Sequence, residues 1–259
     1  MVTTPHELAV TLGDPVAVNA VARALKREDF RRFSKTVATQ GSDAPVFSGF
    51  VSDEPLKRLA GLQREMASRV TREDDFEEAE RFAGADAAYR GDEACAACIV
   101  MDDDLVLLET ASTSEPVRFP YIPGYLMFRE GPVIEAATRL VSGFDLLFVN
   151  GHGVAHPRGC GLASCVGLAL DTPTIGVAGR PLVGDVGERR GQWAPLNYDG
   201  EVVGAEVEVG GSRVYVSVGH RISLGTSVEM VLKTVSGSRF PEPLRRAHVE
   251  ASTMVKRER

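Results

Sequence analysis

One short stretch, FDLLFV at residues 144–149, limits the fold more than any other part of the sequence. Apart from one aspartate it is a continuous apolar run without alternation, which is typical of a parallel strand buried on both faces. Such a strand needs helices on both sides of its sheet, so the run predicts an α/β fold. It ends in Asn150-Gly151-His152-Gly153, and open α/β sheets bind ligands just past the carboxyl ends of their strands.

The other patterns give an order of elements around this strand. Before it, the sequence predicts three antiparallel strands and a helix; after it, helices alternate with strands, and one pair of strands forms a hairpin. A mixed sheet that begins with three adjacent strands and continues through right-handed crossovers is a ribonuclease H-like arrangement. The ranges are strands at 82–89, 93–102, 105–113, 174–177, 201–208 and 214–218, and helices at 124–141, 161–171, 224–235 and from 241 onward.

The first part of the chain is predicted to lie outside this sheet. Residues 1–52 are interpreted as an N-terminal helical extension with a helix at 14–31, and residues 53–259 as the main domain. The stretch 39–53 is rich in Gly, Ser and Pro and reads as a linker. The hydrophobic fraction of 44% is enough for a substantial core in the main domain.

Charge and hydropathy narrow the class of protein. The formal net charge of -7 argues against a polybasic protein that coats DNA, although a local basic groove can still bind nucleic acid. The sequence shows no signal peptide and no apolar run long enough to span a bilayer. We therefore expect a cytoplasmic protein with no membrane partner.

The four cysteines do not form a convincing metal motif. Cys95 and Cys98 fall in a predicted strand, where residues three apart point to opposite faces. They are therefore expected to be buried free thiols, as are Cys160 and Cys165, rather than zinc ligands. Glu206 lies in the predicted hairpin and is expected to face solvent from an edge strand.

Two stretches carry residue types that suit nucleic-acid chemistry. In FPYIPGYLMFREGP, Pro120 and Pro123 stiffen a loop that presents Tyr121. A rigid apolar loop can push between stacked bases, and the same residues also fit a turn that caps a helix. In FAGADAAY, small neighbours leave room beside Asp86 for a metal ion or a sugar-phosphate backbone, although an aspartate on an exposed strand face fits as well.

Several motifs together resemble the endonuclease V family, whose members cut nucleic acid near deaminated purines. The resemblance runs from about Leu56 to His248, and the motifs occur in the order and at about the spacing of the family. They are FPYIPGYLMFREGP, NGHGVAHPRGCGLAS, TPTIGVAG, YVSVGH and PEPLRRAH. The resemblance implies hydrolysis of the second phosphodiester 3′ to the lesion, in DNA or RNA that contains inosine or deoxyinosine.

The resemblance also implies a role for particular residues. Asp86 and Glu130 match carboxylates that bind Mg²⁺ or Mn²⁺, Asn150 stands at a third metal position, and His248 matches a histidine that helps to position the attacking water. Hard carboxylate oxygens are the ligands that Mg²⁺ prefers. In the family, a wedge fills the gap that is left when the damaged nucleotide turns out, and it is matched here by Pro120, Tyr121, Ile122 and Pro123. The walls of the pocket that receives hypoxanthine are matched by Gly124, Leu126, Gly151 and His156.

Four departures from the family pattern leave the activity open. Asn150 stands where the family has an aspartate, Gly179 where it has a lysine, and Cys165 where a histidine is usual. The fourth is Ser217-Val218-Gly219-His220, which stands where the family has SPGH. Each of the first two changes removes a charge from the hydrolytic half of the site. The alternatives are an endonuclease with reduced activity, a protein that binds inosine or a nucleoside without cutting, and an enzyme that uses the pocket for another reaction on a nucleoside or nucleotide.

Overall fold

The computed structural model describes residues 3–30, 37 and 48–257. The chain divides into two compact units. The first unit holds residues 1–62 and 120–125, and the second unit holds residues 63–119 and 126–259. The predicted boundary after residue 52 stays a prediction, and residues 39–47 of the predicted linker lie outside the described residues.

Short helices make up most of the described part of the first unit. They are α1 (Pro5–Thr11), η1 (Pro15–Ala17), α2 (Val18–Ala24) and η2 (Glu28–Phe30), followed by the start of α4 (Pro55–Ala67). The single helix predicted for residues 14–31 is wrong over its described part, residues 14–30, because that part is divided into three pieces. The side chain of Asp14 caps the first piece by accepting a hydrogen bond from the Val16 backbone at 3.0 Å.

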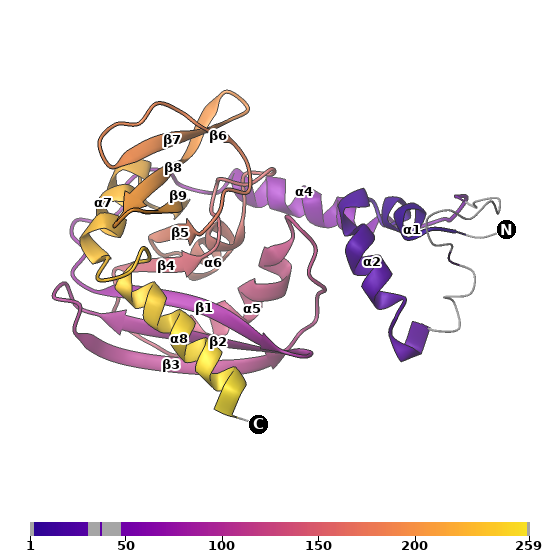
Figure 1. The fold of residues 1–259 in the computed structure, drawn as a ribbon, viewed down its shortest axis with the longest axis horizontal. Helices are drawn as coiled ribbons and strands as arrows, with labels where there is room; N and C mark the ends of the chain where they lie inside the picture. The colour runs from indigo at the N-terminus through magenta and orange to yellow at the C-terminus, as the bar shows by residue number, and fades with distance from the viewer. Residues whose placement is uncertain (1–2, 31–36, 38–47, 258–259) are drawn as a thin grey trace. The chain divides into compact units, whose positions relative to one another are not determined.

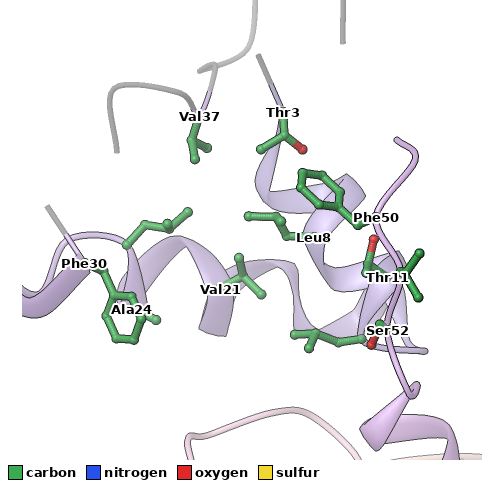
Figure 2. Close-up of a pocket in the computed structure, with 12 residues that line it drawn as sticks. Thr3, Leu8, Thr11, Val21, Ala24, Phe30, Val37, Phe50 and Ser52 are labelled. Carbon is green, nitrogen blue, oxygen red and sulfur yellow. The ribbon is translucent and has the colours of Figure 1, made fainter. Parts of the chain in front are cut away.

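An apolar cavity lies inside the first unit (Figure 2). Its volume is about 670 Å³, and Leu8, Val21, Phe30 and Phe50 are among the side chains that line it. Thr3 and two other hydroxyl residues are the polar members of the lining, and none of the described lining residues is charged. The cavity therefore offers apolar contact and hydroxyl groups but no ionisable group.

Among the described residues of the second unit, one nine-stranded sheet has the order β3-β2-β1-β4-β5-β9-β8-β7-β6. β4 pairs in parallel with β1 and with β5, and the other neighbours are antiparallel. The strands are β1 (Phe82–Arg90), β2 (Glu93–Met101), β3 (Leu107–Pro116), β4 (Leu146–Asn150), β5 (Thr174–Ala178), β6 (Asp185–Val186), β7 (Trp193–Tyr198), β8 (Glu201–Val209) and β9 (Ser212–His220).

Two layers of helices bury the two faces of this sheet. α5 (Leu126–Thr138) and α6 (Leu162–Leu170) cover one face, and α7 (Leu224–Thr234) and α8 (Glu242–Arg257) cover the other. Figure 1 shows α8 crossing β1, β2 and β3.

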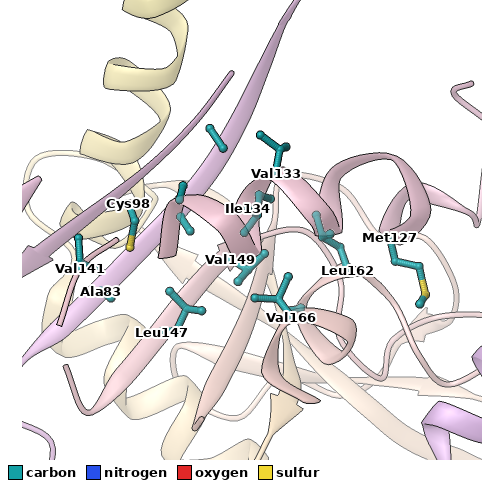
Figure 3. Packing of buried hydrophobic residues seen from close by; sticks show 14 of the residues in the cluster. Ala83, Cys98, Met127, Val133, Ile134, Val141, Leu147, Val149, Leu162 and Val166 are labelled. Atoms are coloured by element: carbon teal, nitrogen blue, oxygen red, sulfur yellow. The ribbon is translucent and has the colours of Figure 1, made fainter. Parts of the chain in front are cut away.

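The continuous apolar run of β4 packs against both helix layers. Leu147 and Val149 pack with Ile134 of α5 (Figure 3), whereas Leu146 and Phe148 pack with the layer that contains α8. These four apolar side chains are fully buried, whereas Asn150 at the end of β4 is half-buried. This burial on both faces confirms the buried parallel strand and the ribonuclease H-like fold.

The structure agrees with most of the predicted elements and differs in a few. β6 and β7 were not predicted, because β6 has two residues and β7 contains Pro195, which interrupts a strand pattern. The amphipathic pattern LKRLAGLQREMASRV predicts a helix in the range 54–80, and the observed helix, α4, ends at Ala67. The four cysteines form no disulfide, as predicted, but only Cys95, Cys98 and Cys160 are buried, and the predicted burial of Cys165 is wrong because it is half-buried. Among the described residues, no helix combines the length and apolar character needed to cross a membrane.

Candidate functional site

Asp86 lies within β1 and is almost fully buried, at 3% exposure. Its Oδ1 accepts hydrogen bonds from the backbone nitrogen of Ala87 at 2.8 Å and from the side-chain amide of Asn150 at 3.1 Å. Its Oδ2 lies 2.7 Å from Nδ1 of His248. Three segments that are distant in the sequence therefore meet at one carboxylate.

The described part of the protein places no arginine or lysine against Asp86. Burial raises the pKa of this carboxyl, and the hydrogen bonds from His248, Asn150 and Ala87 only partly offset the effect. Among the described residues, the one ion-pair partner of Asp86 is the exposed His248. A buried carboxylate without an arginine or lysine partner is a suitable ligand for an external cation.

Glu130 is the second carboxylate of the site and lies on α5. Burial raises its pKa to about 7, and the charge of Asp86 adds to the increase. The two carboxylates are therefore close enough to repel each other, although they approach from opposite faces of β1. Such a pair is stabilised when a cation lies between the charges.

Tyr89 and Arg129 surround Glu130. The guanidinium of Arg129 lies 4.1 Å from the centroid of the Tyr89 ring and donates to the carbonyl oxygen of Phe119 at 2.8 Å. Burial and the charge of Glu130 raise the pKa of the Tyr89 hydroxyl. Tyr89 therefore stays a neutral hydroxyl beside the carboxylate.

Asn150 and His248 reach Asp86 from opposite sides. Asn150 is the last residue of β4, which places its side chain at the carboxyl end of the central parallel strands. His248 projects from α8, and its side chain is 63% exposed. Asp86 thus contacts one residue at the end of a buried strand, Asn150, and one residue with an exposed side chain, His248.

The predicted pocket residues of the second unit are held by their backbone. Gly151 follows Asn150, and its nitrogen donates to the carbonyl oxygen of Val177 at 3.1 Å. A side chain at Gly153 would lie 1.9 Å from the carbonyl oxygen of Val218, so this turn requires glycine. His156 is buried, and its Nδ1 accepts from a backbone nitrogen. Leu126 begins α5.

The predicted wedge residues belong to the first unit. Tyr121 is 53% exposed, whereas Ile122 is buried beneath it at 4%. Gly124 has a φ of +76°, a conformation that favours glycine. The next residue, Tyr125, is fully buried, and its hydroxyl lies 2.6 Å from Oδ2 of Asp14. This bond ties the loop to the helices of the first unit.

The donor set fits a divalent cation that keeps part of its water shell. Among the described residues, no three His, Cys, Asp or Glu side chains come close enough to hold a metal alone. Mg²⁺ is commonly held by one or two carboxylates together with water and substrate phosphate. Asp86, which is buried and has no arginine or lysine partner among the described residues, and Glu130, which is half-buried on α5, satisfy that requirement.

The sequence profile of the endonuclease V family matches residues 64–249. The chain belongs to the endonuclease V family. Members of this family are nucleases that use divalent metal ions.

Relatives and solved structures agree with this assignment. The endonuclease V of Roseiflexus castenholzii is 43% identical over 198 residues, which cover 74% of this chain and 89% of that protein. The crystal structure of endonuclease V from Streptomyces avermitilis is 34% identical, covers 82% of this chain and 97% of its own, and gives a TM-score of 0.73.

A nucleic-acid complex has the same fold. It is the Ciona intestinalis endonuclease V bound to a 24mer DNA that contains an inosine followed by a ribo-adenosine. That chain is 24% identical, with coverage of 80% of this chain and 100% of its own and a TM-score of 0.72.

Some residues beside the site were not predicted from the sequence. Tyr89 follows Asp86 by three positions in the strand, which gave no reason to place it beside Glu130 on a helix. Ser217 accepts a hydrogen bond from the Gly153 nitrogen at 2.9 Å and supports the turn after Asn150. Its strand neighbours this turn only after folding, so no local pattern could have indicated the contact.

Proposed function

We propose that this endonuclease V family member hydrolyses a phosphodiester of inosine-containing nucleic acid, 3′ to the lesion, with a divalent metal ion. The observation that carries the proposal is the pair of carboxylates formed by the buried Asp86 and the half-buried Glu130. Their pKa values are both raised and no arginine or lysine among the described residues pairs with Asp86. The Ciona intestinalis relative in complex with inosine-containing DNA supports the choice of substrate.

Asp86, Glu130 and the side-chain carbonyl of Asn150 would hold the metal, which we propose is Mg²⁺ or Mn²⁺. When bound, such an ion stabilises the charge that develops on the phosphate and lowers the pKa of water. Asp86 also fixes the ring of His248 through the 2.7 Å contact at Nδ1. The other ring nitrogen is then available to orient a water molecule at the exposed side of the site.

We propose that two groups of residues in turns recognise the damaged base, one as the walls of its pocket and one as the wedge. Gly124, Leu126, Gly151 and His156 would line the pocket for hypoxanthine. Hypoxanthine differs from adenine in its six-position carbonyl and its N1–H, which backbone amides and carbonyls can recognise without an ionisable group. Tyr121, flanked by Pro120, Ile122 and Pro123, would fill the gap left by the extruded nucleotide.

One observation favours a second candidate, a protein that binds inosine or a nucleoside without cutting. The amide of Asn150 donates to Oδ1 of Asp86 at 3.1 Å, so its nitrogen faces an oxygen that a metal would use. For Asn150 to bind a metal, its amide has to turn and offer the carbonyl oxygen instead. Even then the site has one negative charge fewer than a site with three carboxylates.

A cleavage assay separates the two candidates. Deoxyinosine DNA, inosine RNA and matched controls with adenine are incubated with the protein and Mg²⁺ or Mn²⁺. Cutting of the inosine substrates by the wild type, abolished by Asp86→Asn, supports the nuclease. Specific binding without any cutting supports the second candidate, particularly if Asn150→Asp together with Gly179→Lys produces cutting. Equal affinity for inosine and adenine substrates, without cutting, contradicts both.

A further inference from the structure

Gly179 follows the last residue of β5 and leaves a space that another side chain fills. A Cβ atom at this position would lie 3.0 Å from Nη2 and 3.7 Å from Cζ of Arg239. Arg239 is sixty positions later in the sequence, in the segment between α7 and α8. The guanidinium of Arg239 therefore occupies the space into which a side chain at position 179 would extend.

This space lies on the same face of the sheet as Asp86. Asn150 is paired with Val177, and alternate residues of a strand share a face, so position 179 points to the side of Asn150. A Cβ on Gly84, two residues before Asp86, would meet the backbone of Pro243 at the start of α8. The chain around the start of α8 thus covers the face that carries Asp86 and Asn150.

Arg239 is held in place without a carboxylate partner. Its Nη1 donates to the carbonyl oxygen of Arg213 at 3.2 Å, and its Cζ lies 5.0 Å from the centroid of the Phe240 ring. By contrast, Arg245 and Arg246 on α8 both pair with Glu242. Within the described part of the chain, no ion pair neutralises Arg239, and its side chain is exposed.

We propose that Arg239 binds a non-bridging oxygen of the phosphate that is cleaved, and so provides the cation that position 179 lacks. The inference rests on the proposed function. A guanidinium can donate two hydrogen bonds to one phosphate and retains its charge throughout the reaction. Its contact with Phe240 and Arg213 orients the group before the substrate binds, which lowers the entropy lost on binding.

Arg180 is the matched control. It is adjacent to Gly179 in sequence and is also exposed. Residues 179 and 180 form a bend after β5, so Arg180 carries the same charge close to β5 without a contact among the described residues that places it at the proposed site. If general positive charge near β5 were sufficient, loss of Arg180 would have the same effect as loss of Arg239.

Two measurements test the inference with full-length wild type, Arg239→Gln, Arg180→Gln and the double variant Gly179→Lys with Arg239→Gln. The first is single-turnover cleavage of deoxyinosine DNA with Mn²⁺. We expect Arg239→Gln to reduce the rate about 100-fold, as loss of one electrostatic contact to a transition state does. The double variant should recover at least about tenfold, since Gly179 has no positive φ to prevent a lysine there.

The second measurement is the affinity for deoxyinosine DNA without divalent metal, as a function of salt concentration. Loss of one phosphate contact lowers the slope of log K against log salt by about one. We expect that decrease for Arg239→Gln and no decrease for Arg180→Gln. A purely structural role for Arg239 would lower the melting temperature but leave the slope unchanged.

The outcomes distinguish this inference from the proposed function. If the wild type cuts and Arg239→Gln retains both its rate and its salt slope, the role of Arg239 is wrong and the proposed function stands. If Arg180→Gln shows the same loss as Arg239→Gln, or the double variant recovers nothing, the specific placement at position 179 is wrong. If the wild type binds without cutting, the proposed function fails and the salt slopes still decide whether Arg239 contacts a phosphate.

Discussion

Two carboxylates buried in the same sheet have opposite surroundings. Asp86 on β1 is 3% exposed, and Glu206 on β8 is 2% exposed. Glu206 forms ion pairs with Arg189 and with Arg213, the latter at 3.6 Å, and accepts a hydrogen bond from the Tyr215 hydroxyl at 2.9 Å. Its charge is therefore balanced inside the protein.

Asp86 has hydrogen-bond donors but no comparable cation. An amide side chain, a backbone nitrogen and an exposed histidine surround it, and its pKa is raised mainly by burial. From this difference we expect that Glu206 stabilises the fold, and that Asp86 lowers stability in the absence of the proposed metal ion. The exposed fractions of Asp86 and Glu206 are nearly equal, so burial alone does not distinguish their roles.

Asp86→Asn should produce the largest effect. The variant keeps an oxygen that can accept from Ala87 and Asn150, but it removes the charge that would hold a metal. We expect cleavage of deoxyinosine DNA to fall about 1,000-fold. The same change should raise the melting temperature by about 2–4 °C, since it removes a buried charge that no protein cation balances.

Single-turnover rates and thermal unfolding in EDTA measure the two effects of Asp86→Asn. Cleavage within tenfold of the wild type would contradict a metal-binding role. A lower melting temperature would contradict the view that Asp86 is a destabilising charge, and would place it with Glu206 as a structural residue.

Glu206→Gln should show the reverse behaviour. Removing the charge leaves Arg189 and Arg213 without their shared buried partner, so we expect the free energy of unfolding to fall by about 1–3 kcal/mol. Cleavage per folded molecule should stay unchanged. Glu208→Gln is the control, because its side chain is 47% exposed and lies 3.7 Å from Arg189. It should change stability by less than about 0.5 kcal/mol.

Urea unfolding measures both stabilities, with cleavage assayed well below the transition. A loss of cutting in folded Glu206→Gln would show that its ion pairs also support the site. Equal stability losses in Glu206→Gln and Glu208→Gln would show that burial of Glu206 adds nothing to its ion pairs.

Asn150→Asp adds a negative charge beside Asp86, whereas Asp86→Asn removes one. The substitution replaces a donor 3.1 Å from Oδ1 with a second negative charge. In EDTA we expect a lower melting temperature because the two carboxylates repel each other. With metal present, the apparent affinity for Mg²⁺ should rise about tenfold, since affinity follows the number of charged ligands.

Metal titrations of cleavage and of melting temperature check these expectations, with Asn150→Ala as the control that removes the amide without adding charge. Unchanged metal dependence in Asn150→Asp would mean that residue 150 does not face the metal. Asp86 and Glu130 would then be the two carboxylates that bind the metal, in contrast to Glu206, whose charge is balanced by arginines.

The fold could be predicted from the sequence because its determinants are local. The continuous apolar run of β4 and the run of small residues in β1 are local patterns, and both strands were expected within two residues of their observed limits. Asp86 was found from its small neighbours, and its likeness to a known family then related it to Glu130, Asn150 and His248.

The electrostatic roles could not be predicted in the same way. Glu206 was expected to face solvent, and this was wrong because β7, which the sequence did not reveal, pairs with β8 and removes it from the edge. Arg239 reaches position 179 from sixty residues away, and Asp14 contacts Tyr125 across more than a hundred. Such contacts depend on how elements pack and leave no periodic signal in the sequence.

The pH dependence of metal binding should give the smallest effect and depends on Glu130. Burial raises the pKa of its carboxyl from 4.5 to about 7 in the folded protein. The metal-free protein should therefore lose stability as the pH rises from about 4.5 through 7, because the folded state then carries a buried charge that the unfolded state carries at no cost. Metal binding requires the ionised form, so it should be weaker below pH 7.

We accordingly expect Mg²⁺ to raise the melting temperature by a few degrees more at pH 8 than at pH 6, as mass action on a site that ionises near 7 requires. Glu130→Gln should bind the metal more weakly and remove most of that difference, whereas Glu206→Gln should retain it, because its own charge is balanced by arginines. The same pH difference in Glu130→Gln would assign the titration to another group, and would leave Asp86 as the one carboxylate in this comparison that requires an external cation.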